Sequence, residues 1–290
     1  MEHKNLTVCK ANEVVEASYR LSLNEQRVVL ACISQVNSTQ ELLETDEFEL
    51  SAKDFAALYG ISKDRAYGEL QEVARNLYQR SLTIHNPDPN RPKLKKMETR
   101  WISSIGYMPE DGKVILRFAR DMLPFLGELK GSFTRYKLEH VGKMTSVYAM
   151  RLYELLAQWQ SVGKREIELV WLKEQLRLDA SYERMNNFKT RVIEPAVKDI
   201  NINSNFNVTW TQRKTGRNIS HLIFEFNEKK KPVDENTKIK SKVKLKNKTE
   251  DIKIENIDHF ADIRKRFGDS VPANAIPTEI VEQLKSQGRW

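Results

Sequence analysis

The amino-terminal third of the chain contains three stretches in which apolar side chains recur every three or four positions, as on a helix with one buried face. The first follows Ser22-Leu23-Asn24-Glu25, a capping box in which the serine and glutamate side chains each satisfy a free backbone N–H. The second begins at Ser51, and Gly60-Ile61-Ser62 separates it from the third, which runs from Lys63 to about Arg80. A helix, a short turn containing glycine and another helix predict a helix-turn-helix unit.

The apolar pattern then changes to the alternation that is typical of strands. Glu47–Leu50 and Ser81–His85 each read as a strand, and Arg100–Met108 and Lys113–Phe118 flank Asp111-Gly112, a dipeptide that tolerates the positive φ of a tight hairpin turn. A helix-turn-helix followed by a hairpin predicts a winged helix. The mixed, polar segment Lys130–Lys143 suits a connection between two domains.

The same order of elements begins again in the second half of the chain. A constant offset aligns Ile33 with Leu152, Ser62 with Ser181 and Val73 with Val192. The sequence therefore predicts an α+β protein with two tandem winged-helix domains related by internal duplication. We expect the first domain to span residues 1–136 and the second 137–228, followed by a lysine-rich linker and a short helical tail over 229–290.

Ser181–Ile200 is the expected counterpart of the third helix, with Ser181 as its N-cap. One stripe of this helix is apolar, which predicts its buried face. The opposite stripe carries Glu183, Arg184, Asn187, Thr190, Arg191 and Lys198. Arginine and asparagine carry the paired donors and acceptors that match guanine and adenine edges in a major groove. An ordinary solvated helix face, with the arginines paired to nearby acids such as Glu183 or Glu194, is the alternative.

The hairpin that follows this helix is expected to contact the sugar-phosphate backbone. Its strands, Phe206–Trp210 and Ser220–Phe226, are joined by a basic turn containing Arg213, Lys214 and Arg217. A wing beside a docked helix lies along the DNA backbone, where lysine and arginine neutralise phosphates. Three further residues on or near the helix are expected at phosphates: Ser181, Lys189 and Lys198.

Charge and composition agree with an anionic partner. The 290 residues are 40% hydrophobic and 30% charged, and the formal net charge is +8. The chain begins without the apolar stretch of a signal peptide, and no window approaches a membrane span, so no membrane is expected. Its two cysteines, Cys9 and Cys32, have no metal or redox spacing, which favours a reduced cytoplasmic protein.

The motifs of common catalytic sites are missing from the sequence. No G-x-x-x-x-G-K-[ST] phosphate loop occurs, so ATP-driven unwinding by this chain is not expected. The five histidines never fall as H-x-H or H-E-x-x-H, so neither a metal-dependent nicking site nor a zincin is visible. We expect no catalytic residues, no metal and no cofactor.

Three long motifs resemble the iteron-binding plasmid replication initiators. They are Thr145–Leu156 (TSVYAMRLYELL), Phe188–Asn201 (FKTRVIEPAVKDIN) and the wing Arg213–Arg217 (RKTGR), and Leu21–Arg27 (LSLNEQR) is similar to the same family's amino-terminal domain. The resemblance covers roughly residues 5–228. It implies two winged-helix domains, of which the second reads origin repeats in the major groove and the first provides a dimerisation face and an auxiliary DNA contact.

The resemblance also implies roles for single residues. Arg184, Asn187, Thr190 and Arg191 would occupy the base-reading positions, and Thr190 stands where the family often has a second basic residue. In the first domain, the helix Lys63–Arg80 matches Ser181–Ile200 in position but carries carboxylates at Asp64, Glu69 and Glu72. These would face phosphates, so this helix is expected to bind DNA poorly. The hairpin of this domain is instead rich in apolar residues, which predicts a dimer interface over Trp101, Ile105, Val114, Ile115 and Leu116.

These observations lead to one expected function and two alternatives. We expect a cytoplasmic replication initiator, in a bacterial host, that binds origin direct repeats as a monomer, helps to open the duplex, and recruits the host helicase and initiator proteins. The apolar hairpin predicts a dimer, in equilibrium with the monomer, that binds an inverted-repeat operator, and the resemblance implies that this dimer represses its own gene. The alternatives are a winged-helix transcriptional repressor and, from a different class, a rolling-circle nicking enzyme.

Overall fold

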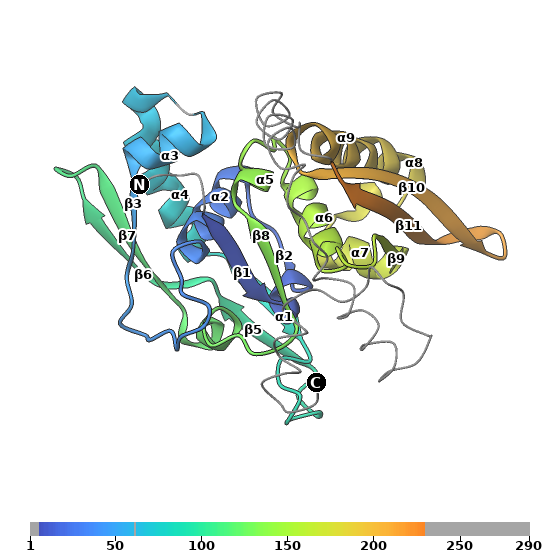
Figure 1. The fold of residues 1–290 in the computed structure, drawn as a ribbon, viewed down its shortest axis with the longest axis horizontal. Helices are drawn as coiled ribbons and strands as arrows, with labels where there is room; N and C mark the ends of the chain where they lie inside the picture. The colour runs from blue at the N-terminus through green and yellow to red at the C-terminus, as the bar shows by residue number, and fades with distance from the viewer. Residues whose placement is uncertain (1–5, 61, 230–290) are drawn as a thin grey trace, which may run out of the picture. The chain divides into compact units, whose positions relative to one another are not determined.

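The computed structural model describes residues 6–60 and 62–229 (Figure 1). The predicted linker and tail lie, apart from Lys229, outside the described residues. Within those residues, none of the helices has the length and apolar character needed to cross a membrane.

The first winged helix consists of three helices and an antiparallel sheet of order β3-β7-β6. Its elements are α2 (Leu23–Ile33), β3 (Phe48–Ser51), α3 (Ala52–Tyr59), α4 (Lys63–Tyr78), β6 (Ile102–Met108) and β7 (Lys113–Phe118). The predicted capping box is present, because Glu25 N–H donates to the Ser22 hydroxyl and Ser22 N–H donates to the Glu25 carboxylate. Gly60 ends α3 with a φ of 67° and Gly112 forms the hairpin turn with a φ of 61°, a region that glycine enters without steric cost.

The second winged helix repeats this plan, with a sheet of order β9-β11-β10. Its elements are α6 (Val147–Ala157), β9 (Lys164–Glu168), α7 (Leu169–Gln175), α8 (Met185–Phe188), η4 (Lys189–Ile193), α9 (Glu194–Asn203), β10 (Phe206–Thr215) and β11 (Asn218–Glu228). In each sheet the strand before the helix-turn-helix pairs antiparallel with the last strand of the hairpin. The predicted pair of winged-helix domains is confirmed.

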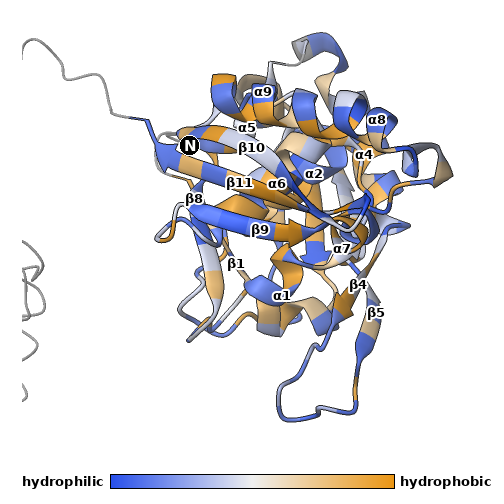
Figure 2. Cartoon of the chain, turned by 90° about the vertical axis from the view of Figure 1, so that its right-hand side faces the viewer, coloured by the Kyte–Doolittle hydropathy of each residue, from blue (hydrophilic) through white to orange (hydrophobic). Residues whose placement is uncertain are grey.

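Two further sheets surround the first winged helix. One has the order β2-β4-β5 and the other pairs β1 with β8. The strands are β1 (Thr7–Ala11), β2 (Ser18–Tyr19), β4 (Ser81–His85), β5 (Lys96–Arg100) and β8 (Phe133–Lys137), and the short helices are α1 (Asn12–Val15), η2 (Arg120–Phe125), η3 (Ala180–Tyr182) and α5 (Glu139–Gly142). Beyond β4 and β5 the connecting loop extends as a hydrophilic hairpin (Figure 2).

The pairing of β1 with β8 corrects one expectation. The segment Lys130–Lys143 was expected to be a polar connection, but Phe133–Lys137 forms a full antiparallel ladder with Thr7–Ala11. Its exposed and buried residues alternate in the structure, but the partner strand lies more than a hundred residues away in the chain. The predicted domain boundary at residues 136 and 137 falls within β8 and stays a prediction.

Buried side chains from both winged helices form one continuous hydrophobic cluster. Arg151 of α6 crosses between them, because its guanidinium donates to the carbonyls of Val15 and Ala17 and to the Tyr19 hydroxyl, at 3.1, 2.7 and 2.6 Å. Only 2% of Arg151 is exposed. The second winged helix is therefore attached to the first through α6 by buried polar bonds as well as by apolar packing.

Candidate nucleic-acid interface

The helix that faces outward in the second domain, called the reading helix below, is Met185–Asn203. It is continuous but not uniform, because Lys189–Ile193 in its middle form a π-helical turn. Pro195 accounts for this turn: proline has no N–H to donate to the carbonyl four residues earlier, and its ring crowds that carbonyl. The sequence-based expectation of a regular helix with even angular spacing is therefore wrong around Thr190 and Arg191.

The start of the reading helix also differs from the expectation. Ser181 was expected to cap it, but Ser181 lies in η3, where the Asp179 carboxylate accepts from the Ser181 N–H at 3.0 Å and from its hydroxyl. These two hydrogen bonds are the main cause of the lowered pKa of Asp179. The helix begins four residues later, with Arg184 at the N-cap and in an extended conformation. Ser181 is exposed and stays a candidate phosphate contact.

Arg184, at the N-cap of the reading helix, and Arg191, within it, are both free cations. Both side chains are exposed, and among the described residues neither guanidinium has a hydrogen bond or an ion pair. The alternative in which they pair with Glu183 or Glu194 is not what the structure shows. Because no neighbouring carboxylate neutralises them, both arginines present their full set of donors to an acceptor outside the chain.

Asn187 and Thr190, the other two predicted base readers, each make one bond inside the chain. The Asn187 amide donates to the Ser181 carbonyl at 3.0 Å, and the Thr190 hydroxyl donates to the Asn186 carbonyl at 2.9 Å. The first bond joins η3, which precedes the reading helix, to the first turn of that helix. Asn187 keeps its amide oxygen and a second N–H, which is the pair that an adenine edge requires.

The wing is longer and more regular than the sequence suggested. Its strands were expected to end at Trp210 and to resume at Ser220, but the ladder continues to Thr215 and Asn218, with a β-bulge between Arg213 and Lys214. The turn consists of Gly216, with a φ of 62°, and Arg217. The basic segment is thus held on a paired hairpin.

The three predicted cations of the wing are not equivalent. Arg213 forms an ion pair across β11 with Glu166 of β9, and this hydrogen bond is the main cause of the lowered pKa of Glu166. Lys214 and Arg217 are exposed and, within residues 6–60 and 62–229, have no ion pair. The structure therefore separates two free cations from one that is already partly neutralised.

Lys189 and Lys198 differ in the same way. Lys189 is half-buried, with its ammonium 5.7 Å from the centroid of the Trp210 ring, so it is held against the base of the wing. Lys198 is exposed on α9. Lys189 lies against the wing and Lys198 on the reading helix, and their contacts with the DNA backbone stay a prediction.

Lys173 is a residue that the sequence analysis missed. It lies on α7, donates to the Glu183 carbonyl at 3.2 Å and sits 5.3 Å from the centroid of the Phe188 ring. Burial lowers its pKa. Lys173 therefore fixes the segment that leads into the reading helix, and no local pattern marked it because its partners come from other elements.

The predicted dimer surface of the first domain needs a correction. Trp101, Val114 and Leu116 are at most 1% exposed, so they belong to the core of this chain. Trp101 packs edge-on against Tyr19 at 4.9 Å between ring centroids. Ile105 and Ile115 are half-buried, and Tyr107 on the same hairpin is 42% exposed.

The helix of the first domain that matches the reading helix, α4, has a mixed outer surface. Asp64, Arg65, Glu72 and Arg75 are exposed and Glu69 is half-buried. Carboxylates repel phosphates, whereas the outer face of the reading helix carries unpaired arginines. The two domains are thus unequal copies of one fold.

Comparison with known proteins identifies the relatives of this chain. Residues 7–157 match the family described as "Initiator Replication protein, WH1", and residues 168–226 match "Initiator Rep protein, WH2". A replication initiation protein of Escherichia coli is 32% identical over 228 residues, which cover 76% of this chain and 69% of that protein. The PI protein of Escherichia coli is 26% identical over 256 residues, covering 77% of this chain and 83% of that protein.

A solved structure shows the same arrangement of elements. The crystal structure of the Pi initiator protein in complex with iteron DNA matches with a TM-score of 0.67 and 24% identity, over 79% of this chain and 99% of that chain. The similarity supports the fold, and the two family matches together span most of the described residues. The chain belongs to the initiator replication protein family, in which two winged-helix domains follow one another.

Proposed function

We propose that this protein initiates plasmid replication by binding repeated origin DNA, the iterons, through the reading helix of its second winged helix. The observation that carries the proposal is the pair Arg184 and Arg191, two exposed guanidinium groups without a partner among the described residues. They flank Asn187 on a helix that follows a helix-turn-helix turn, the element that enters the major groove in this fold. The iteron complex of the similar Pi initiator supports this assignment.

Base reading and backbone binding fall to different parts of the site. Arginine can bond to O6 and N7 of guanine, and the free amide atoms of Asn187 suit adenine. Lys214 and Arg217 at the tip of the wing, together with Lys198, are exposed cations. Within the described residues no hydrogen bond holds their side chains in one orientation, which suits contacts with phosphates. Specificity then depends on the helix, while much of the affinity comes from the wing.

Initiation requires more than binding. The sequence has no phosphate loop, so the energy for opening the origin would come from DNA binding and from the host helicase and initiator proteins that the complex recruits. The protein would act in the cytoplasm of its bacterial host and would need no cofactor. This division of labour agrees with the initiator family to which the chain belongs.

The first winged helix would provide the dimer that represses the initiator's own gene. In the described part of the chain, β6 is an outer strand of the sheet β3-β7-β6. Its unpaired backbone edge and the exposed Tyr107 suit pairing with a second copy. The revised interface consists of the β6 edge, with Ile105 and Tyr107, and replaces the buried residues of the hairpin.

One experiment separates this function from its alternatives. The gene with its flanking DNA is placed on a plasmid that lacks an origin, and plasmid maintenance is scored for the wild type and for Arg184→Ala/Arg191→Ala. We expect maintenance only with the wild type, and footprints on direct repeats. A repressor would footprint an operator but would not maintain the plasmid, and a nicking enzyme would leave a covalent protein–DNA adduct.

A further inference from the structure

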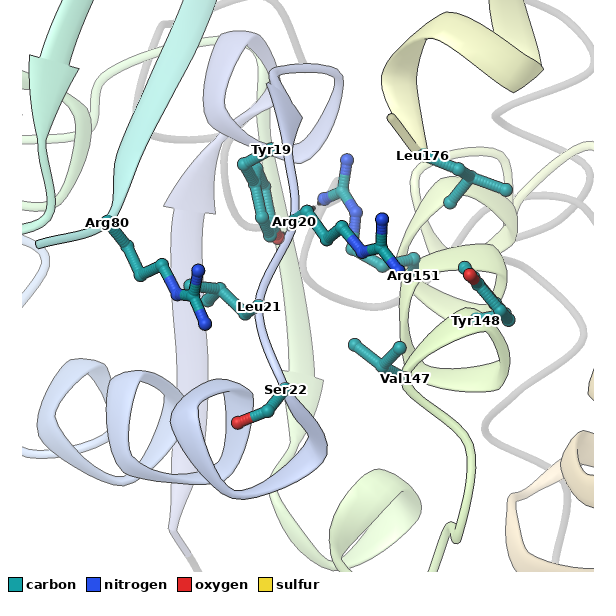
Figure 3. A pocket seen from close by; sticks show the side chains of 9 residues that line it. All are labelled: Tyr19, Arg20, Leu21, Ser22, Arg80, Val147, Tyr148, Arg151 and Leu176. Atoms are coloured by element: carbon teal, nitrogen blue, oxygen red, sulfur yellow. Dashed lines mark hydrogen bonds between the residues drawn. The ribbon is translucent and has the colours of Figure 1, made fainter. Parts of the chain in front are cut away.

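A hollow lies where the two winged helices meet (Figure 3). Its volume is about 300 Å³. The first winged helix contributes Arg20 and Ser22, between β2 and α2, and Arg80, just after α4. The second contributes Tyr148 and Arg151 of α6, and Leu176, which follows α7.

Among the described residues, three arginines and no carboxylate line the hollow. Arg151 is buried and bound to backbone carbonyls of the first domain, so its guanidinium is held in place. The Arg80 Nε donates to both carboxylate oxygens of Glu25, at 3.0 and 3.1 Å, which holds that guanidinium in place. Glu25 balances the charge of Arg80, and Glu154 lies 3.6 Å from Arg151, so the third arginine is the one whose charge an anion would balance.

Arg20 is the arginine left available. Its side chain is exposed and reaches across the hollow towards α6 (Figure 3). Within the described residues it has no ion pair and no hydrogen bond. Its charge adds only a minor contribution to the lowered pKa of Asp179, after the hydrogen bonds from Ser181.

Two helices begin beside the hollow. Ser22 is the N-cap of α2, and Val147, the first residue of α6, also lines the hollow. The Glu25 carboxylate accepts from the Ser22 N–H and the Asp199 carboxylate accepts from the Ser146 N–H, so both helix starts are already capped within the chain. Burial, with the Tyr182 hydroxyl to which it is hydrogen-bonded, raises the pKa of Tyr148, which therefore keeps its proton.

We propose that this hollow binds a backbone phosphate of the DNA at the point where the duplex passes from one winged helix to the other. Arg20 would contact the phosphate directly, Tyr148 would donate a hydrogen bond, and Arg80 and Arg151, each held by its own partners, would form the walls of the site. The position supports a DNA phosphate, because α4 ends at one side of the hollow and α7, the helix before the reading helix, ends at the other. The proposal rests on the proposed iteron binding.

The test measures binding of the full-length protein to a fluorescent single-repeat duplex by anisotropy, across a range of salt concentrations. We expect Arg20→Ala to weaken binding roughly tenfold and to lower the log–log salt slope by about 0.9, as for one lost phosphate contact. Tyr148→Phe should weaken binding by a smaller factor. The matched control is Arg135→Ala, which removes an exposed arginine of β8 outside the hollow and should leave both quantities unchanged.

A second arm locates the phosphate. Single phosphates of the duplex are replaced in turn by uncharged methylphosphonate, and each duplex is bound to the wild type and to Arg20→Ala. We expect one position, or two adjacent ones, to weaken the wild type but not the variant. If no position behaves in this way, or if Arg20→Ala keeps the wild-type affinity and slope, the proposal is wrong.

The controls also separate this proposal from the function on which it rests. A wild type that binds the repeat no better than random DNA would contradict iteron reading itself. A wild type that prefers the repeat while Arg20→Ala is unchanged would contradict only the phosphate site. Inorganic phosphate that stabilises the wild type but not Arg20→Ala, with equal DNA binding by both, would assign the hollow to a free anion and overturn the DNA assignment.

Discussion

Lys10 and Glu154 form an ion pair inside the protein, with Nζ 2.6 Å from Oε1 and both side chains fully buried. Lys10 lies on β1, in the two-stranded sheet with β8, and Glu154 lies on α6 of the second winged helix. The Tyr136 hydroxyl donates to the same carboxylate, and Arg151 lies 3.6 Å from its other oxygen. Glu154 is therefore the counter-charge for two buried cations at the joint between the domains.

Removing this carboxylate should destabilise the whole described fold. We expect Glu154→Gln to lower the free energy of unfolding by about 3–5 kcal/mol, because it leaves buried charges unpaired. The double variant Lys10→Met/Glu154→Gln should recover part of the loss, as measured by urea unfolding. Lys113→Met, which breaks an exposed pair with Glu49, is the control and should leave the midpoint almost unchanged. Equal midpoints for Glu154→Gln and the wild type would contradict this role.

Buried tyrosines should make the fold sensitive to alkaline pH. Burial raises the pKa of Tyr59 and Tyr153, and burial together with the neighbouring Glu154 raises that of Tyr136. The unfolded chain ionises near the ordinary tyrosine pKa of about 10, so stability is fully present below that pH and is lost as the pH rises above it. Ultraviolet titration should show these three hydroxyls ionising only as the protein unfolds. Early ionisation of all nine tyrosines would contradict the prediction.

The reading helix and the wing should respond differently to substitution. Arg184→Ala or Arg191→Ala should cost about 1–3 kcal/mol on the specific repeat and little on random DNA. Lys214→Ala and Arg217→Ala should weaken both DNAs alike and lower the salt slope by roughly one each. Arg213→Ala should change the slope less, because Arg213 is already paired with Glu166. Equal losses on both DNAs for the helix variants would remove them from base reading.

Pro195 should matter for recognition more than for folding. Pro195→Ala restores the missing N–H, so the π-helical turn should relax towards an α-helix and rotate Thr190 and Arg191 relative to Asn187. We expect unchanged or higher thermal stability together with weaker and less specific binding of the repeat, by anisotropy. Wild-type specificity in this variant would show that the π-helical turn has no part in recognising the DNA sequence.

The dimer edge can be tested at an exposed position. Tyr107→Glu places a charge beside the β6 edge, and we expect it to shift the protein towards the monomer in light scattering over a dilution series. Leu43→Glu is the matched control, because Leu43 is 51% exposed in the loop before β3, which is the opposite outer strand of this sheet. A wild type that is monomeric at every concentration, or a Tyr107→Glu variant that keeps its dimer, would exclude the interface.

Local patterns were enough to predict most of the architecture. The capping box at Ser22 and Glu25, the turn at Gly60 and the hairpin at Gly112 depend on residues within a few positions of each other, so the sequence shows them directly. The repeated order of helices and strands likewise follows from apolar spacing. The sequence also predicted Arg184 and Arg191 as exposed, although Arg184 lies at the N-cap and Arg191 in a π-helical turn rather than on one regular helix face.

Contacts between distant segments had to come from the tertiary structure. The β1–β8 ladder, the pairing of Arg213 with Glu166 and the burial of Trp101 against Tyr19 all join residues that no local pattern connects. Whether a cation is free to bind DNA depends on whether a carboxylate from another element pairs with it. Arg213 and Arg217 therefore looked alike in the sequence and differ only in the structure. The sequence by itself determined which helix carries the candidate base-contacting residues and which hairpin is basic. Only the packing of the two domains decided which charges stay free and where Arg20, Arg80 and Arg151 meet, because burial and charge pairing arise from elements far apart in the chain.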